Sequence, residues 1–153
     1  MPKQLSEHFT LEELVLSQTA ARSGIDNTAP KEIVQNLREL ARVLEQVRTL
    51  LGGVPILISS GYRCPELNRA IGGSKSSAHM RGLAADFTAP SFGTVLQVAR
   101  KVAASDIGFD QVIHEYGSWV HIGLANIGEE PRLQRLSIFR NTGYLKGIVT
   151  SPA

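Results

Sequence analysis

One amphipathic stripe constrains this fold more than any other feature of the sequence. Between Pro30 and the Gly52-Gly53 pair, apolar residues recur at spacings of three and four, which is the period of a helix with one buried face. Proline suits the start of a helix and glycine suits its end. The sequence therefore predicts a long helix between these signals, whose buried face carries Ile33, Leu37, Leu40, Leu44, Val47 and Leu51.

Shorter segments surround this helix, and strands dominate the second half of the chain. Thr10 and Glu13 form a capping-box pattern that opens a short helix over 9–14, and further helices are expected from Pro65 to Ala70 and over 91–104. Apolar runs bounded by turn residues predict strands over 55–60 (a buried one), 82–88, 110–115, 119–124 and 136–140. The remaining segments 19–29, 72–77 and 125–135 are expected to be loops. Helices first, then strands mixed with one helix, favour an α+β fold.

The length of 153 residues suits one domain. Hydrophobic residues make up 42% and charged residues 20%, which is typical of a globular chain rather than a disordered or fibrous one. The sequence contains no internal repeat and no linker. We therefore expect a single domain over 1–153, with loosely ordered ends at 1–8 and 143–153.

Charge and cysteine content argue against several classes of protein. The net charge is +2 and basic residues alternate with acidic ones, as in Arg38-Glu39, so we expect no nucleic-acid partner. The single cysteine, Cys64, cannot form an internal disulfide, and Pro65 after it favours a turn or helix start over a nucleophile. The N-terminus lacks the apolar core of a secretory signal, and no apolar run is long enough to span a membrane. These features predict a protein made in the cytoplasm without a signal peptide and without membrane insertion.

The segment 77–86 carries the strongest chemical signal. It offers an imidazole, His79, at the end of a loop and a carboxylate, Asp86, on the strand that follows, and zinc binds both. By the period of two, Gly82 and Ala84 share a strand face with Asp86, which leaves space on that face. A carboxylate within an apolar strand is costly to bury without a partner, and a metal is such a partner. The alternative is that Asp86 caps a turn and His79 is an exposed loop residue.

A second histidine could complete a metal site. His121 lies on the predicted strand 119–124, on the same face as Trp119. A single histidine on a strand can also be an ordinary core or surface residue. Together, His79, Asp86 and His121 would supply three ligands and leave the fourth position of a zinc ion for water, which is the catalytic arrangement.

Acidic residues near this second histidine are candidates for a general base. Glu115, six positions before His121, is the first candidate, and its carboxylate could take a proton from an attacking water. Asp110 is the second candidate, and a surface glutamate at a hairpin end is the alternative interpretation of Glu115. His114 could be a fourth ligand or an acid, but as the neighbour of Glu115 it should point to the opposite face.

Arg63, before the metal segment, and Ser77, at its start, are candidates for substrate contacts. Arg63 follows the predicted strand 55–60, and a guanidinium near zinc would suit a substrate carboxylate or carbonyl; an ordinary surface ion pair is the alternative. Ser77 could donate a hydrogen bond to a substrate carbonyl. Phosphate-binding loops, Gly-x-Ser-x-Gly elbows and His-Glu-x-x-His motifs are missing from the sequence, which argues against those catalytic templates.

The assembled pattern resembles the zinc DD-peptidases and their Hedgehog-fold relatives, a group that includes VanX/VanY-type D-alanyl-D-alanine peptidases and phage cell-wall endopeptidases. The pattern is Ser77-x-His79-x-x-Gly82-x-Ala84-x-Asp86, followed by Trp119-x-His121. The segment 58–68 is similar to the lead-in of this family, in which the arginine faces the substrate. Segments 9–14 and 26–28 resemble its small phage and prophage branch. The resemblance covers the chain from about residue 8 to residue 124.

The resemblance implies roles for individual residues. His79, Asp86 and His121 would bind Zn²⁺, and Glu115, Arg63 and Ser77 would be catalytic, with Arg63 and Ser77 also contacting the substrate. We expect the substrate to contact Trp119 as well. Many family members carry a histidine two positions before the last ligand or an acidic residue three before it; here these positions are Trp119 and Ser118. The base must then be Glu115 or a residue elsewhere.

The resemblance also implies a fold and a reaction. The fold is a small antiparallel sheet flanked by helices, with zinc in an open groove. The reaction is hydrolysis of peptide bonds in peptidoglycan stem peptides or cross-links, as a DD- or LD-endopeptidase or carboxypeptidase. We expect a monomeric endolysin of phage or prophage origin that acts on the cell wall after release, or a virion component. Two alternatives are a zinc-containing, non-catalytic cell-wall or phage-tail binding module and a cytoplasmic D-Ala-D-Ala dipeptidase.

Overall fold

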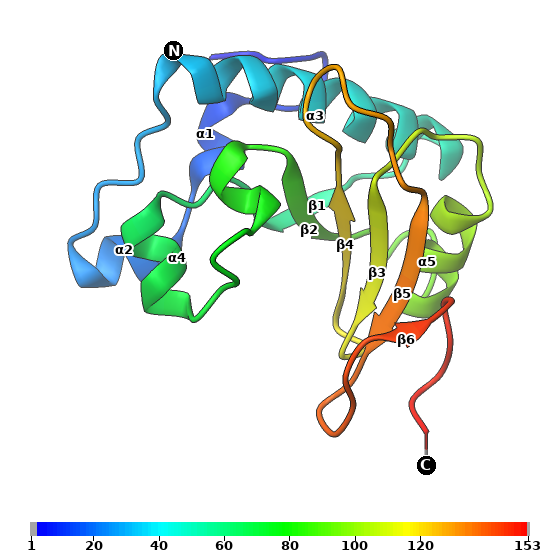
Figure 1. Ribbon diagram of the computed structural model, residues 1–153. Helices are drawn as coiled ribbons and strands as arrows, with labels where there is room; N and C mark the ends of the chain where they lie inside the picture. The colour runs from blue at the N-terminus through cyan, green and yellow to red at the C-terminus, as the bar shows by residue number, and fades with distance from the viewer. Residues whose placement is uncertain (1–2, 153) are drawn as a thin grey trace.

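The computed structural model describes residues 3–152, which fold into helices packed around one six-stranded sheet (Figure 1). The helices are α1 (Leu11–Val15), α2 (Gln18–Ser23), α3 (Lys31–Leu50), α4 (Pro65–Ile71), the 3-10 helix η1 (Ala78–Arg81) and α5 (Val95–Ala103). The strands are β1 (Leu57–Ser60), β2 (Ala84–Thr88), β3 (Gln111–Glu115), β4 (Trp119–Gly123), β5 (Gln134–Ile138) and β6 (Leu145–Lys146). Among residues 3–152, no helix has both the length and the apolar character that a membrane crossing requires. The α+β prediction is confirmed.

The sheet is mixed, with strand order β1-β2-β4-β3-β5-β6. All neighbouring strands are antiparallel except β3 and β5, which are parallel. The expected purely antiparallel sheet is therefore wrong at this one pairing. Because β2 already occupies the other edge of β4, β5 pairs with the free edge of β3. It runs parallel to β3 because it starts at the end of the sheet where β4 finishes and β3 begins.

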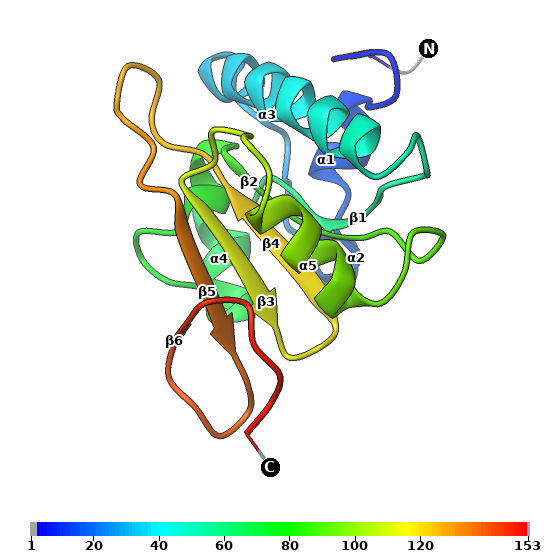
Figure 2. The same ribbon diagram turned by 90° about the vertical axis from the view of Figure 1, so that its right-hand side faces the viewer.

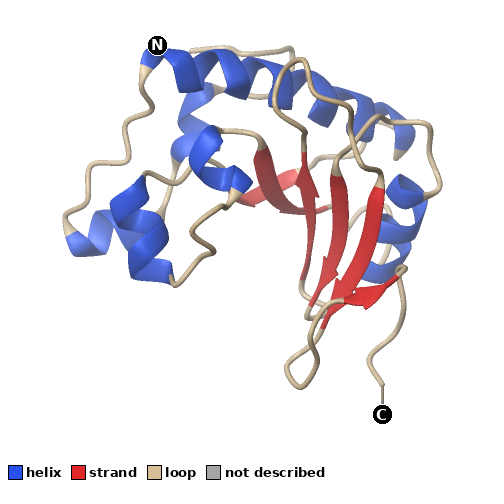
Figure 3. Ribbon diagram, in the orientation of Figure 1, coloured by secondary structure: helices blue, strands red, loops and turns tan. Residues whose placement is uncertain are grey.

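The two faces of the sheet have different surroundings. Helix α5 covers one face of β3 and β4, and α3 closes one end of the same layer (Figure 2). The side chains that face this apolar core include Phe87, Val120 and Ile122, each fully buried. Because side chains alternate along a strand, Asp86 and His121 face the opposite side of the sheet. On that side α2 and α4 lie apart from β3 and β5 (Figure 3).

Local signals explain most of the helices, but α2 and the 3-10 helix η1 were not expected. Thr10 caps α1 by accepting a hydrogen bond from the Glu13 N–H, and α3 begins after Pro30, both as predicted. The predicted loop over 19–29 is wrong in its first half, because Ser17 caps helix α2 and Gly24 ends it in a left-handed conformation. The small and polar residues of the segment gave no helical pattern, and the helix is defined instead by the capping residues at its two ends.

Other elements differ from their predicted form. Strand β2 begins at Ala84 instead of residue 82, because Gly82 ends η1 in a left-handed conformation and so does not share a strand face with Asp86. Strand β1 is an edge strand with alternating exposure rather than a buried strand, because only β2 pairs with it. Helix α5 begins at Val95 instead of residue 91, because Thr94 and Gln97 form a capping box that fixes its start.

The two ends of the chain make specific contacts. In the N-terminal segment, the Ser6 hydroxyl and the His8 backbone N–H both donate to the Glu45 carboxylate of α3, each at 2.6 Å. In the C-terminal segment, β6 pairs with β5, and Ser137 donates to the Gly147 carbonyl at 2.7 Å. The Val149 N–H also donates to the Ser137 hydroxyl. The segment from residue 143 to Val149 therefore packs against the sheet and is not loosely ordered. Residues 1, 2 and 153 of the expected loose ends lie outside the described residues.

Candidate metal centre

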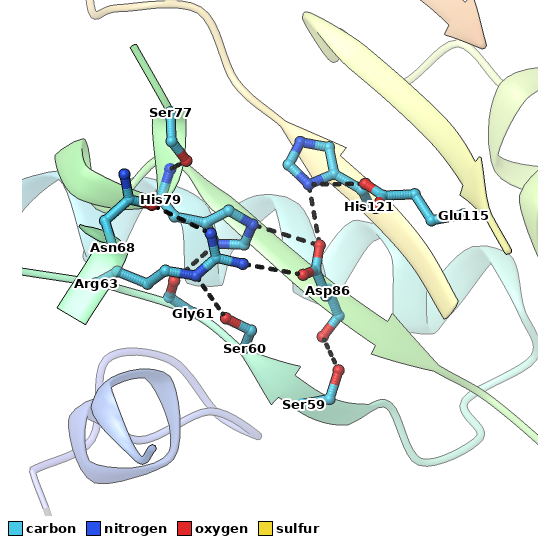
Figure 4. A network of polar contacts seen from close by, with 10 residues as sticks. All are labelled: Ser59, Ser60, Gly61, Arg63, Asn68, Ser77, His79, Asp86, Glu115 and His121. Carbon is cyan, nitrogen blue, oxygen red and sulfur yellow. Dashed lines mark hydrogen bonds and ion pairs between the residues drawn. The ribbon is translucent and has the colours of Figure 1, made fainter. Parts of the chain in front are cut away.

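Three residues that are far apart in the sequence meet on the face of the sheet opposite α5. His79, Asp86 and His121 offer ligand atoms that all lie within 4.8 Å of one another, and all three are nearly buried (Figure 4). His79 comes from η1, Asp86 from β2 and His121 from β4. The structure thus brings together the three residues that the sequence nominated as metal ligands.

The pairing of β2 with β4 fixes two of these ligands. Asp86 and His121 are direct cross-strand partners, so both side chains leave the sheet on the same face. Their facing atoms, His121 Nδ1 and Asp86 Oδ1, lie 2.9 Å apart. His79 Nε2 lies 3.4 Å from the same oxygen. Two zinc ligands at tetrahedral angles are separated by about 3.3 Å, given metal–ligand bonds of about 2 Å.

The third ligand is held by a backbone carbonyl. Ser77 caps η1 by accepting from the His79 N–H, and Nδ1 of the ring lies 2.7 Å from the Gly61 carbonyl oxygen. Since a carbonyl only accepts, Nδ1 must donate, and the neutral ring then presents the lone pair of Nε2 toward Asp86. Metal-binding histidines are oriented in this way by a bond from their second nitrogen.

Close packing holds Gly61 itself in place. Its α-carbon lies against the Leu14 carbonyl of α1, where any β-carbon would collide, and the next residue, Tyr62, donates its N–H to that same carbonyl at 2.7 Å. The N-terminal helix therefore supports the metal site through the backbone that anchors His79.

The ionisation states match what a metal requires. Burial raises the pKa of Asp86, but the hydrogen bond with His121 and the closeness of His79 outweigh this effect, and the pKa falls well below the ordinary value. Burial lowers the pKa of His79 more than the nearby carboxylate raises it. At neutral pH the site thus holds a carboxylate and a neutral imidazole, the forms that bind zinc. By donor type, spacing and protonation, this group fits a zinc ion.

Arg63 lies beside the ligands and is firmly anchored. Its Nη2 is 3.6 Å from Asp86 Oδ2, its Nε donates to Ser60 Oγ at 3.2 Å, and its Nη1 donates to Asn68 Oδ1 at 3.3 Å. Asn68 is buried, and its amide also donates to the Ser74 carbonyl. Sequence analysis predicted a role for Arg63 but none for Ser60 or Asn68. A side chain that only orients another side chain belongs to no motif that could be recognised in the sequence.

Glu115 lies on the other side of the ligand group. Its Oε1 is 3.7 Å from His121 Nδ1, at the end of β3 and opposite Trp119 on β4. Burial is the largest influence on the pKa of Glu115 and raises it above the ordinary value. A carboxyl group whose pKa is raised in this way suits proton transfer near neutral pH.

The other candidate residues lie elsewhere or act locally. Asp110 is bound to Arg132 through its side chain, with Nη2 to Oδ2 at 2.6 Å, and is outside the ligand group. His114 faces away from the site as expected, and its Nδ1 lies 3.1 Å from the Val149 carbonyl. The Ser77 hydroxyl is engaged in capping η1. Trp119 stands beside Tyr116, with ring centroids 5.6 Å apart.

Comparison with known proteins gives one finding. A family model described as Peptidase M15 matches residues 7–123, which is more than half of the chain and includes His79, Asp86, Glu115 and His121. No curated protein matches the sequence significantly.

Proposed function

The chain belongs to the peptidase M15 family of metallopeptidases, and on this premise we propose that it is a zinc-dependent hydrolase of peptide bonds in peptidoglycan stem peptides or cross-links. The observation that carries the proposal is the buried group of His79, Asp86 and His121 with Glu115 beside it. The family supports the metallopeptidase activity. The proposal adds the bond type, of DD- or LD-endopeptidase or carboxypeptidase kind, and a role in phage or prophage lysis, which rest on the resemblance of the sequence.

The residues around the ligands have complementary tasks in this reaction. His79, Asp86 and His121 would hold the zinc ion, which when bound supplies a Lewis acid that polarises a carbonyl and acidifies water. Glu115 accepts one proton from the attacking water, whose oxygen bonds to the carbonyl carbon. The carbon–nitrogen bond then breaks, and Glu115 delivers the proton to the departing nitrogen, leaving a carboxylic acid and an amine.

Arg63 would orient the substrate from the opposite side of the ligands. Its guanidinium is fixed by Ser60 and Asn68, so binding a substrate carboxylate or carbonyl costs little further ordering of the side chain. One Nη atom already lies near Asp86. A substrate group bound to Arg63 would therefore be held close to the metal ligands.

The test is mass spectrometry of purified peptidoglycan after incubation with the zinc-loaded protein, with and without a zinc chelator. We expect new fragments that the chelator suppresses, and their masses identify the bond. A folded, zinc-loaded protein that leaves the wall intact and cleaves D-Ala-D-Ala would be a dipeptidase. A folded, zinc-loaded protein that cleaves neither would be a non-catalytic binding module. Either result would overturn the proposal.

A further inference from the structure

The C-terminal hairpin brings a tyrosine to the Glu115 side of the site. In the pairing of β5 with β6, Ser137 is opposite Leu145, the first residue of β6. Tyr144 immediately precedes Leu145, and because the two strands are antiparallel it lies toward the Ile138 end of β5. Ile138 is the partner of Glu115 in the pairing of β3 with β5. Cross-strand partners share a face, so extending this register by one residue would put Tyr144 opposite Ile138, on the face that carries Glu115. Figure 2 shows β6 lying across the end of β5.

The surroundings of the Tyr144 hydroxyl agree with this register. Burial is the largest influence on its pKa and raises it, and the nearby charges of Glu115 and Asp86 raise it further. Those two carboxylates belong to the site, in agreement with the side of the sheet that the extended register gives Tyr144. Tyr144 as a whole is 63% exposed, so its ring is accessible to a ligand.

Trp119 is the cross-strand partner of Glu115, the Tyr116 ring lies beside Trp119, and Tyr144 precedes β6 at the same end of the sheet. We call Tyr116, Trp119 and Tyr144 the aromatic rim. Tyr116 is 47% exposed and its ring is tilted against that of Trp119. The Trp119 indole N–H is buried and has no well-formed hydrogen bond to any described residue. Exposed aromatic rings grouped beside a site provide large contact areas for a ligand at little cost in side-chain entropy.

The direction of proton transfer assigns this rim to one part of the substrate. Arg63 contacts Asp86 from one side, whereas Glu115 lies near His121 on the other. If Glu115 protonates the departing nitrogen, the residue that carries this nitrogen must leave on the Glu115 side. The rim is then the surface that this residue meets first.

We propose that the aromatic rim binds the amine-side portion of the substrate, and that Tyr144 is a specificity-determining residue for peptides that extend beyond the cleaved bond. The proposal rests on the proposed peptidase function. The family match ends at residue 123, so the segment that carries Tyr144 lies outside it. Strands β5 and β6 thus add a specificity element to the part of the chain that holds the metal ligands.

The first test compares two synthetic stem peptides with the same carbonyl side. In one, the leaving group is an amino acid or dipeptide; in the other, a terminal amide, it is ammonia. We expect Tyr144→Ala to lower kcat/KM about tenfold for the extended peptide, the value of a good aromatic contact, and to leave the amide unchanged. Tyr144→Phe keeps the ring and removes the hydroxyl, so it distinguishes the contribution of the ring from that of the hydroxyl. Phe92→Ala, which removes an exposed aromatic side chain before α5, is the control. Equal losses for both peptides, or no loss for either, would overturn the proposal.

The second test does not depend on catalysis. Trp119 is the only tryptophan in the chain, so its fluorescence reports on the rim. We expect the amine-side dipeptide to change the fluorescence of the metal-free wild type. In Tyr144→Ala, the dipeptide concentration that gives half of this change should be about tenfold higher. If the wild type cleaves neither peptide but the fluorescence response depends on Tyr144, the peptidase proposal fails and the binding surface stands. If the wild type shows no response, or if Tyr144→Ala responds like the wild type, the aromatic rim does not bind the amine-side portion of the substrate as proposed.

Discussion

At the Arg63 end of the site the side chains are held by several hydrogen bonds, whereas at the Glu115 end they are held by few. Arg63 has Ser60, Asn68 and Asp86 as partners, and His79 has the Gly61 carbonyl. Glu115, in contrast, lies 3.7 Å from His121 Nδ1, which is longer than a hydrogen bond. A metal ligand gains from being fixed before the metal arrives, while a proton carrier must move between the water and the departing nitrogen. The difference in anchoring thus matches the difference in task.

The two carboxylates of the site show the same contrast in their pKa values. The side chains of Asp86 and Glu115 are only 8% and 17% exposed, and burial is the largest influence on both. The pKa of Asp86 nevertheless falls, because the hydrogen bond with His121 and the closeness of His79 stabilise its charge. The pKa of Glu115 rises, because it lacks comparable bonds. Similar burial therefore yields a ligand in one case and a proton carrier in the other.

Removing the central ligand should have the largest effect. Asp86→Asn keeps the size of the side chain but removes the charge that both histidines face. We expect zinc affinity to fall by more than about 100-fold, since the loss of an outer partner alone costs about 10- to 100-fold. Competition with a chromogenic chelator measures this affinity, and circular dichroism checks the fold. A folded variant that binds zinc as tightly as the wild type would remove Asp86 from the ligand set.

Removing the proton carrier should separate catalysis from metal binding. We expect Glu115→Gln to lower kcat by roughly 100- to 10,000-fold while the zinc content stays at the wild-type level, because the side chain transfers protons and does not hold the metal. Steady-state kinetics and metal analysis of the same sample provide the two readouts. Loss of zinc from this variant would show that the two ends of the site are not independent, and unchanged kcat would show that another group is the base.

The ligand group could be anticipated from sequence because its signals are local. His79 and Asp86 lie within one short segment, and strand alternation alone puts Asp86 on a single face. The sequence around His121 did not by itself predict a metal ligand, and this prediction rested on the family resemblance. Its place beside Asp86 comes from the β2–β4 register, which forms between segments about 35 residues apart.

The features that sequence analysis missed depend on long-range packing. Strand β5 pairs with β3 because β2 already occupies the other edge of β4. Helix α2 consists of small and polar residues, and its capping Ser17 stood just before the segment assigned as a loop. Tyr144 had no recognisable motif, and only the fold of the C-terminal segment against β5 brings it toward Glu115.

Loosening the anchor of Arg63 should have a smaller effect. Ser60→Ala removes the hydroxyl that accepts from Arg63 Nε but leaves the ion pair with Asp86. One such hydrogen bond contributes roughly 1 kcal/mol, so we expect kcat/KM to fall about fivefold, with zinc binding unchanged. Ser59→Ala, next to it on β1, removes a hydroxyl that bonds only to the Asp86 backbone carbonyl and serves as the control. Equal losses in the two variants would mean that β1 acts through the strand rather than through Arg63.

The smallest effect is expected at Asp110, the carboxylate that the sequence offered as an alternative base. Its hydrogen bonds with Arg132 are the main cause of a pKa below the ordinary value. A lowered pKa in the folded state means that the interaction stabilises the protein at pH values above about 3.9, the value in unfolded chains, and that this contribution is lost as the pH falls through the folded-state pKa. Because Arg132 is 57% exposed, solvent screening limits the contribution to about 1 kcal/mol or less. Asp110→Asn should therefore keep wild-type kcat, lower the free energy of unfolding slightly at pH 7, and match the wild type in urea titrations at acidic pH. A large loss of kcat in this variant, with Glu115→Gln active, would transfer the role of base from the Glu115 end of the site to the start of β3.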